Sequence, residues 1–257
     1  AHRGGWGYGD PDRANTYALN PVAQNEILHG DTSQQYLYGD IFGKVDIVPG
    51  ILNAKVNFSY KNYFGETSTL RKKGNWTMGQ GDDAAYISYS TAKHDKILVE
   101  PTLNYAQKIG KNDISAVAGY SYDFFHEEYR GETKLDPLVI GDKYITSFNS
   151  ATGTQTCTGS YIEHILMSYF ARVNYSFDDR YLIQLTGRRD GTSRLPKTTR
   201  WSSFGSVSLG WRISNEKFFN VDWIDDLKIR ANLGTLGNTN IGAWDYQATI
   251  NTAPRAI

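Results

Sequence analysis

A period-two alternation of apolar and polar residues constrains this chain more than any other feature of its sequence. Successive residues of a strand point to opposite faces of a sheet, so the alternation predicts strands whose two faces differ in polarity. Some segments, such as 167–177, keep the pattern for about 11 residues, which suits tilted membrane strands better than the shorter strands of globular sheets. The predicted strands span 34–47, 51–63, 96–107, 113–126, 163–177, 180–190, 200–213 and 226–236.

The two phases of this alternation differ sharply in charge. Over the stretches with the clearest alternation, such as 167–177 and 181–187, one phase holds no charged residue, although 21% of the chain is charged. That phase includes Val56, Leu103, Val173, Ile183, Leu209 and Ile229, whereas the opposite phase carries Arg172, Arg188, Arg212, Lys228 and Arg230. The pattern predicts an all-β fold, either part of an up-and-down transmembrane barrel with lipid against the apolar face or a soluble β-sandwich that buries it. Aromatic residues near both strand ends favour the membrane barrel.

The connections between the predicted strands alternate between short and long. Antiparallel meander order would place the short connections at one rim and the long ones at the other. The short set is 48–50, 108–112, 178–179 and the somewhat longer 214–225, and the long set is 64–95, 127–162 and 191–199. We expect residues 1–33 to form an extracellular loop, strands from about residue 34 onward, and at most a helical turn within 215–226.

Composition excludes several classes of function. The 27 basic and 27 acidic residues give no net charge for holding a phosphate backbone, so we expect no nucleic-acid partner. The single cysteine, Cys157, rules out an intramolecular disulfide, and the five histidines show no metal-ligand spacing. Adjacent carboxylates on a strand point to opposite faces, so pairs such as Asp178 and Asp179 indicate solvated turns rather than a hydrolase site. We therefore expect no enzymatic activity, metal or cofactor.

Four stretches in the second half carry a resemblance to a known family. They are 166–176, with Tyr169-Phe170-Ala171-Arg172-Val173; 188–194, Arg188-Arg189-Asp190-Gly191-Thr192-Ser193-Arg194; 200–214, with Trp201-Ser202-Ser203-Phe204; and 227–238, with Leu233-Gly234-Thr235-Leu236-Gly237-Asn238. In their order and spacing they resemble the barrel of the SusC/RagA family of TonB-linked (TonB-dependent) outer-membrane transporters.

The resemblance implies a barrel of about 22 strands, of which residues 1–257 would supply about eight. It also implies a location in the bacterial outer membrane, contact with its lipid, and import of oligosaccharides or peptides. The implied partners are a SusD-like surface lipoprotein that forms a lid, and the TonB complex. The plug domain and the TonB-contacting segment, which lies in the N-terminal part of such proteins, are expected to be absent from this segment.

Two groups of residues are candidates for functional contacts. Arg172, Arg188, Arg212 and Arg230 are expected to face the lumen, where pairing with carboxylates is the simpler role and substrate contact the alternative. Aromatic residues in the long connections could stack on sugar rings or contact a lid protein, or they could pack within their own loops. These residues are Trp76, Tyr86, Tyr129 and Tyr144.

We predict that residues 1–257, refolded alone in water, do not form a stable monomer. Their uncharged strand face would exceed the few hundred Å² of apolar surface that monomers usually tolerate, and this favours aggregation or capture by detergent. Size-exclusion chromatography without detergent tests this expectation. A monodisperse monomeric peak with cooperative thermal unfolding would contradict it.

Overall fold

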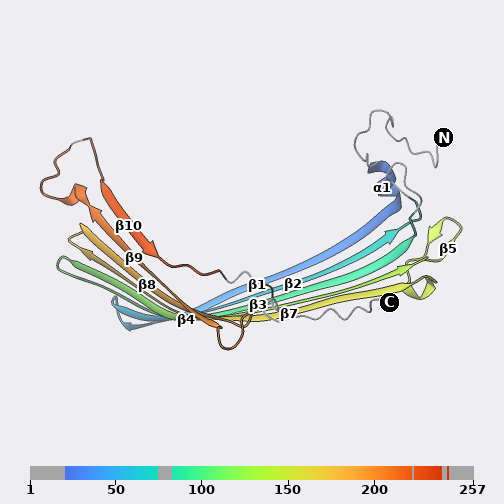
Figure 1. The fold of residues 1–257 in the computed structure, drawn as a ribbon, viewed down its shortest axis with the longest axis horizontal. Helices are drawn as coiled ribbons and strands as arrows, with labels where there is room; N and C mark the ends of the chain where they lie inside the picture. The colour runs from blue at the N-terminus through green and yellow to red at the C-terminus, as the bar shows by residue number, and fades with distance from the viewer. Residues whose placement is uncertain (1–20, 75–82, 222, 239–241, 243–257) are drawn as a thin grey trace, which may run out of the picture. The chain divides into compact units, whose positions relative to one another are not determined.

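The structure of the chain, a computed structural model, describes residues 21–74, 83–221, 223–238 and 242 (Figure 1). Strands dominate it, and eight of them form one sheet in chain order, β1-β2-β3-β4-β7-β8-β9-β10. The elements are α1 (Pro21–Ile27), β1 (Leu28–Val48), β2 (Leu52–Arg71), β3 (Tyr86–Ile109), β4 (Asn112–Leu135), β5 (Val139–Ile140), β6 (Lys143–Tyr144), the 3-10 helix η1 (Phe148–Ser150), β7 (Gln155–Phe177), β8 (Tyr181–Thr192), β9 (Trp201–Arg212), the 3-10 helix η2 (Ile213–Asn215) and β10 (Lys228–Gly234).

The eight predicted strands are confirmed in number and order. Only the two-residue strands β5 and β6 lie outside the large sheet in the described part of the chain. A soluble sandwich needs a second sheet packed face to face on the first, and the described residues do not supply one. The fold is therefore an antiparallel meander, as an up-and-down barrel requires.

Four strands extend further toward the long connections than the alternation predicted. β2 continues to Arg71, β3 begins at Tyr86, β4 continues to Leu135 and β7 begins at Gln155. The segments 64–71 and 86–95 are rich in Ser, Thr and Tyr, and they lack an uncharged apolar phase. Threonine and tyrosine favour strands, and backbone pairing continues without a lipid-facing side, so hydrophobic alternation cannot mark these ends.

The N-terminal boundary also differs from the prediction. β1 begins at Leu28, not near residue 34, and the helix α1 directly precedes it. Pro21 is the first helical residue, a position at which proline costs no hydrogen bond, and this was the missed signal for a helix start. The helical turn expected within 215–226 lies instead at Ile213–Asn215, so it shares only Asn215 with that range. No helix in the described part of the chain is long and apolar enough to cross a membrane.

The chain divides into two compact units. The turn-side unit comprises 38–61, 95–126 and 162–257 and contains all four short connections. Its strand register sorts residues onto two faces, because residues paired across antiparallel strands share a face. Val173, Leu185, Val207 and Leu233 lie opposite one another across β7, β8, β9 and β10. Arg172, Thr186 and Ser206 lie opposite one another across β7, β8 and β9. The register thus gives this unit one apolar face and one polar face.

The apolar face of the turn-side unit is not covered by other described residues. Leu185 is 48% exposed, Leu209 51% and Ile229 57%. A soluble domain would bury side chains of this kind in a core, whereas a barrel in a membrane presents them to lipid. Contact with lipid would therefore shield the exposed apolar side chains of this face from water.

The loop-side unit comprises 1–37, 62–94 and 127–161 and holds the small buried core. All the apolar side chains buried in the described part of the chain lie in it: Ala23, Ile27, Ala85, Ile87 and Ala151. The Lys72 amide donates to the Ile27 carbonyl at 2.8 Å and the Asp136 amide donates to the Ala85 carbonyl at 3.1 Å. These bonds fasten α1 to the end of β2, and the 127–162 connection to the 64–95 connection, as predicted for these two long connections. The third long connection, 191–199, belongs to the turn-side unit.

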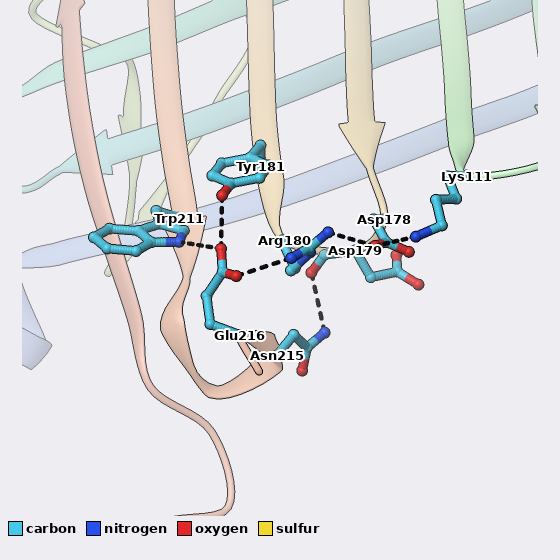
Figure 2. Close-up of polar contacts among 8 residues, drawn as sticks. All are labelled: Lys111, Asp178, Asp179, Arg180, Tyr181, Trp211, Asn215 and Glu216. Atoms are coloured by element: carbon cyan, nitrogen blue, oxygen red, sulfur yellow. Dashed lines mark hydrogen bonds and ion pairs between the residues drawn. The ribbon is translucent and has the colours of Figure 1, made fainter. Parts of the chain in front are cut away.

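The short connections lie together at one rim of the turn-side unit. Asp178 and Asp179 both have positive φ, 54° and 53°, as the two central residues of a type I′ hairpin turn require. The Asp178 amide donates to the Lys111 carbonyl at 2.7 Å, and the Asn215 side chain donates to the Asp179 carbonyl at 3.1 Å. Three successive connections, 108–112, 178–179 and 214–225, are therefore linked side by side (Figure 2).

Glu216 is the acceptor on which this rim converges (Figure 2). Its carboxylate accepts hydrogen bonds from the Tyr181 hydroxyl at 2.7 Å, the Trp211 indole at 3.1 Å and the Arg180 guanidinium at 2.8 Å. Arg180 also pairs with Asp178 at 2.6 Å, and Lys111 pairs with Asp178 at 2.9 Å. The polar ends of two aromatic residues are thus fixed at the rim by one carboxylate that is itself neutralised by an arginine.

We predict that Glu216→Ala lowers the midpoint of thermal unfolding of the intact protein in detergent by several degrees. The substitution leaves the Tyr181 hydroxyl and the Trp211 indole without an acceptor and removes one of the two carboxylates that pair with Arg180. Lys217→Ala, at the exposed neighbouring position, is the matched control and should leave the midpoint unchanged. Equal midpoints for both variants would show that the network does not stabilise this rim.

The same network predicts a pH dependence of stability. Hydrogen bonds from Tyr181 and Trp211 lower the pKa of Glu216 from its ordinary 4.5, and the bond from Lys111 lowers the pKa of Asp178 from 3.8. A carboxylate with a lowered pKa in the folded state contributes stability that is full above its unfolded pKa and is lost as pH falls through the folded value. The midpoint difference between wild type and Glu216→Gln should thus be constant near neutral pH and shrink below about pH 4. A difference that grows in acid would contradict this assignment.

Candidate functional site: the polar face and the loop side

The four arginines expected to face the lumen all lie on the polar face of the turn-side unit. Arg172 is in β7, Arg188 in β8, Arg212 at the end of β9 and Arg230 in β10. In the strand register, Arg188 lies opposite Phe170 on β7 and Phe204 on β9, and Arg212 lies opposite Lys228 on β10. The polar face therefore combines cationic and aromatic side chains, which is a suitable surface for polar or anionic organic ligands.

These arginines differ in their partners. Arg188 donates to Asp190 at 2.6 Å, two residues along its own strand, and to the Ser168 hydroxyl at 2.9 Å on β7. Arg212 pairs with Asp226 at 3.4 Å. No carboxylate among the described residues forms an ion pair with Arg172 or Arg230. The simpler structural role thus fits Arg188 and Arg212, while Arg172 and Arg230 present charges that the described residues leave unneutralised.

A hollow of about 360 Å³ lies on the polar face near the short connections. Arg230 lies opposite Gly210 in the strand register, and a Cβ at Gly210 would come within 3.4 Å of the Leu182 and Lys228 side chains. Across the hollow, the Asn174 amide donates to the Ser115 hydroxyl at 3.1 Å. Its polar lining includes Asp113, Ser115, Asn174, Gln184, Ser208, Lys228 and Arg230. The alternation of the sequence predicts the face on which Lys228 lies, but not that Lys228 lines the same hollow as Arg230.

The aromatic candidates fall in different places. Trp76 lies outside the described residues. Tyr86 and Tyr129 lie within β3 and β4 and not in loops, and Tyr129 is 39% exposed. Tyr144 lies in β6, and its hydroxyl accepts a hydrogen bond from the Lys73 amide at 3.3 Å. Tyr144 therefore packs within its own connections, and Tyr129 is the candidate whose ring is open to a ligand.

A second hollow, of about 510 Å³, lies in the loop-side unit. Ile87, which is 2% exposed, is one of its lining residues, and Tyr89 donates to Glu66 at 2.8 Å beside it. The lining also includes His29, Asp31, Glu132 and Phe148. No local motif marks these residues in the sequence, because β1, β2, β3 and the 127–162 connection bring them together from distant positions.

His164 marks a third polar cluster, on β7 of the turn-side unit. One Arg194 guanidinium nitrogen lies 3.3 Å from both ring nitrogens, and the Phe125 ring lies 4.8 Å away between centroids. Lys96 and Asp123 form an ion pair of 2.8 Å that lines the same small hollow. Arg194 is the last residue of the 188–194 motif and follows the end of β8. Its contact with His164 therefore places a loop residue of the motif against β7.

The described residues contain no cluster of side chains that could hold a metal ion. No group of three or more histidine, cysteine, aspartate or glutamate side chains comes together among them. Glu127 pairs with His94 at 3.5 Å whereas Glu128 pairs with Arg130, which is consistent with opposite directions for adjacent strand residues. Cys157 is exposed and free.

Comparison with known proteins adds relatives of one kind. The chain is 30% identical over 230 residues to the TonB-dependent receptor SusC of Bacteroides thetaiotaomicron, matching 87% of this chain and 22% of that protein. It is 29% identical over 245 residues to a TonB-dependent receptor of Formosa agariphila, matching 90% of this chain and 22% of the relative. No family model matches the sequence.

Solved structures agree on the fold. A structure of the RagAB peptide transporter superposes with a TM-score of 0.77 at 20% identity, covering 92% of this chain and 26% of that chain. The RagAB peptide importer in an open-open state gives 0.76 at 22% identity with the same coverage. The chain spans about a fifth of the length of the curated relatives that it matches. It thus belongs to the SusC-type TonB-dependent receptors of the bacterial outer membrane and is part of their barrel.

Proposed function

We propose that this chain is part of an active importer of oligosaccharides or peptides in the outer membrane. The carrying observation is the two-faced single sheet, apolar on one side and rich in arginine, lysine and aromatic residues on the other. In a membrane the apolar face meets lipid, which leaves the polar face to line the lumen. The similarity of about nine-tenths of the chain to TonB-dependent receptors supports this orientation.

The rims give the proposed direction of transport. Outer-membrane barrels have short periplasmic turns and longer extracellular loops. The rim with the linked turns 108–112, 178–179 and 214–225 is then periplasmic, and the long connections 64–95 and 127–162 are extracellular loops. The hollow beside Ile87 and the ring of Tyr129 are in that case exposed to incoming substrate or to a SusD-like lipoprotein lid. Energy would come from the TonB complex through parts of the protein outside this chain.

Within the lumen, we assign Arg172 and Arg230 to contact with substrate or with an acidic surface of the plug. Both lie on the polar face, and neither is paired with a carboxylate among the described residues. Arg188 and Arg212 hold neighbouring polar groups in place through Asp190, Ser168 and Asp226. This division separates arginines that hold the wall of the lumen from arginines that face its contents.

The proposed function is tested by growth of the parent bacterium after deletion of the complete receptor gene. We expect loss of growth on one class of oligosaccharide or on peptide mixtures, with growth on simple sugars and amino acids unchanged. Disruption of the TonB complex should produce the same defect. Growth that is unchanged on every oligosaccharide and peptide source would reject an importer.

We also predict that Arg172→Ala combined with Arg230→Ala lowers uptake of the substrate so identified by about tenfold, the effect of losing one or two charge-assisted contacts. Val173→Ala, adjacent to Arg172 but on the apolar face, is the matched control and should leave uptake near wild type. Receptor levels in the outer membrane must be equal for this comparison. Equal uptake by both variants would remove Arg172 and Arg230 from the transport path.

A further inference from the structure

One arginine of the turn-side unit lies on the apolar face. The predicted uncharged phase of β8 runs through Tyr181, Ile183, Leu185 and Gly187, and the register shows that Arg189 continues it. Arg189 pairs across the strands with Tyr169 on β7 and with Ser203 on β9. It is exposed, and it occupies the end of the face farthest from the short turns.

Arg189 lies on a platform of aromatic rings. Its guanidinium is 5.6 Å from the centre of the Trp201 ring, which is within the range of a cation–π contact. Trp201 stacks with Tyr169 at 5.8 Å between centroids, and Tyr169 contacts Tyr120 at 5.1 Å. Gly191 makes the platform possible, because a Cβ there would come within 2.7 Å of the Trp201 ring. We call Tyr120, Tyr169, Arg189 and Trp201 the outer platform.

The charge of Arg189 has no anionic partner in the described part of the chain. No carboxylate there pairs with it, whereas its neighbour Arg188, on the polar face, pairs with Asp190 at 2.6 Å. The opposite end of the sheet gives a second contrast. Arg180 lies 5.7 Å from the Tyr181 ring, a similar arrangement, yet it pairs with both Glu216 and Asp178. Arg180 is neutralised by carboxylates of the protein, whereas Arg189 has no such partner among the described residues.

A charge on a lipid-facing surface is costly unless an anion lies at the same depth. Tyrosine and tryptophan belts mark the boundary between hydrocarbon and headgroups, so the outer platform lies at headgroup level. The anions at that level are lipid phosphates, and guanidinium binds phosphate through paired N–H donors with defined geometry. The Ser203 hydroxyl, directly across from Arg189, adds a further donor.

We propose that the outer platform is a binding site for the phosphate of a membrane lipid, with Arg189 as the phosphate ligand and Trp201 holding its guanidinium in place. In the orientation proposed above, that lipid belongs to the outer leaflet. The aromatic rings pack against the sugar or glycerol portion next to the phosphate. The site lies on the face opposite the lumen, so it is separate from substrate transport.

The test uses the complete receptor in nanodiscs of an uncharged galactolipid, which carries no phosphate, with a minor fraction of a phosphorylated glycolipid. Native mass spectrometry after release from the nanodisc counts the glycolipid molecules retained per protein. We expect wild type to retain the phosphorylated lipid and not its dephosphorylated form. Arg189→Gln should lower retention by about tenfold, the effect of one charge-assisted pair. Because the bilayer has the same composition on both sides, the result does not depend on orientation or on transport.

Arg188→Gln is the matched control, since it removes the same charge one residue away on the polar face. It should retain lipid like wild type. Arg189→Lys should give intermediate retention, because lysine keeps the charge but loses the planar stack on Trp201. Unchanged retention in Arg189→Gln, or equal loss in Arg188→Gln and Arg189→Gln, would overturn the proposal. Thermal unfolding of each variant verifies that the barrel is intact.

Discussion

Backbone hydrogen bonding between neighbouring strands is the interaction on which the rest of this structure depends. In hydrocarbon no water is present to pair an N–H or C=O group, so every lipid-facing strand must be paired along its length. The meander meets this requirement with short connections such as 178–180, in which the left-handed backbone of Asp178 and Asp179 reverses the chain. Side chains are then free to differ completely between the two faces, because none of them is needed to hold the strands together.

This division explains what could be predicted from the sequence. Where a strand separates lipid from a polar face, its alternation predicts the strand and the face of each residue, as for Val173 and Arg172. Beyond the membrane both sides of a strand are polar, so the extensions of β2 and β3 toward the long connections leave no such signal. The partners of Arg188 and Arg212 were not predictable either, since a face can be assigned from one strand but a contact requires the register of two.

Residues of the 188–194 segment have structural roles that account for their identity. Asp190 holds Arg188, and Gly191 leaves space for the Trp201 ring. Thr192, which is 3% exposed, accepts a hydrogen bond from the Arg194 amide, and the Ser193 hydroxyl accepts one from the Ile165 amide at 2.9 Å. The segment ends a strand and returns the chain onto β7, which is a structural reason for this combination of small and polar residues.

Arg188 and Arg189 are chemically identical and adjacent, yet the strand period gives them different surroundings. Arg188 faces polar groups, where a carboxylate two residues along the strand neutralises it. Arg189 points to the apolar side, where a carboxylate would itself need a partner, and its described neighbours there include the Trp201 ring and Ser203. A cation in that position is stable if the bilayer supplies the anion. The headgroup layer then makes specific contacts with the barrel in addition to solvating it. In the proposed site, the positive charge of Arg189 lies at the depth of the negatively charged lipid phosphates.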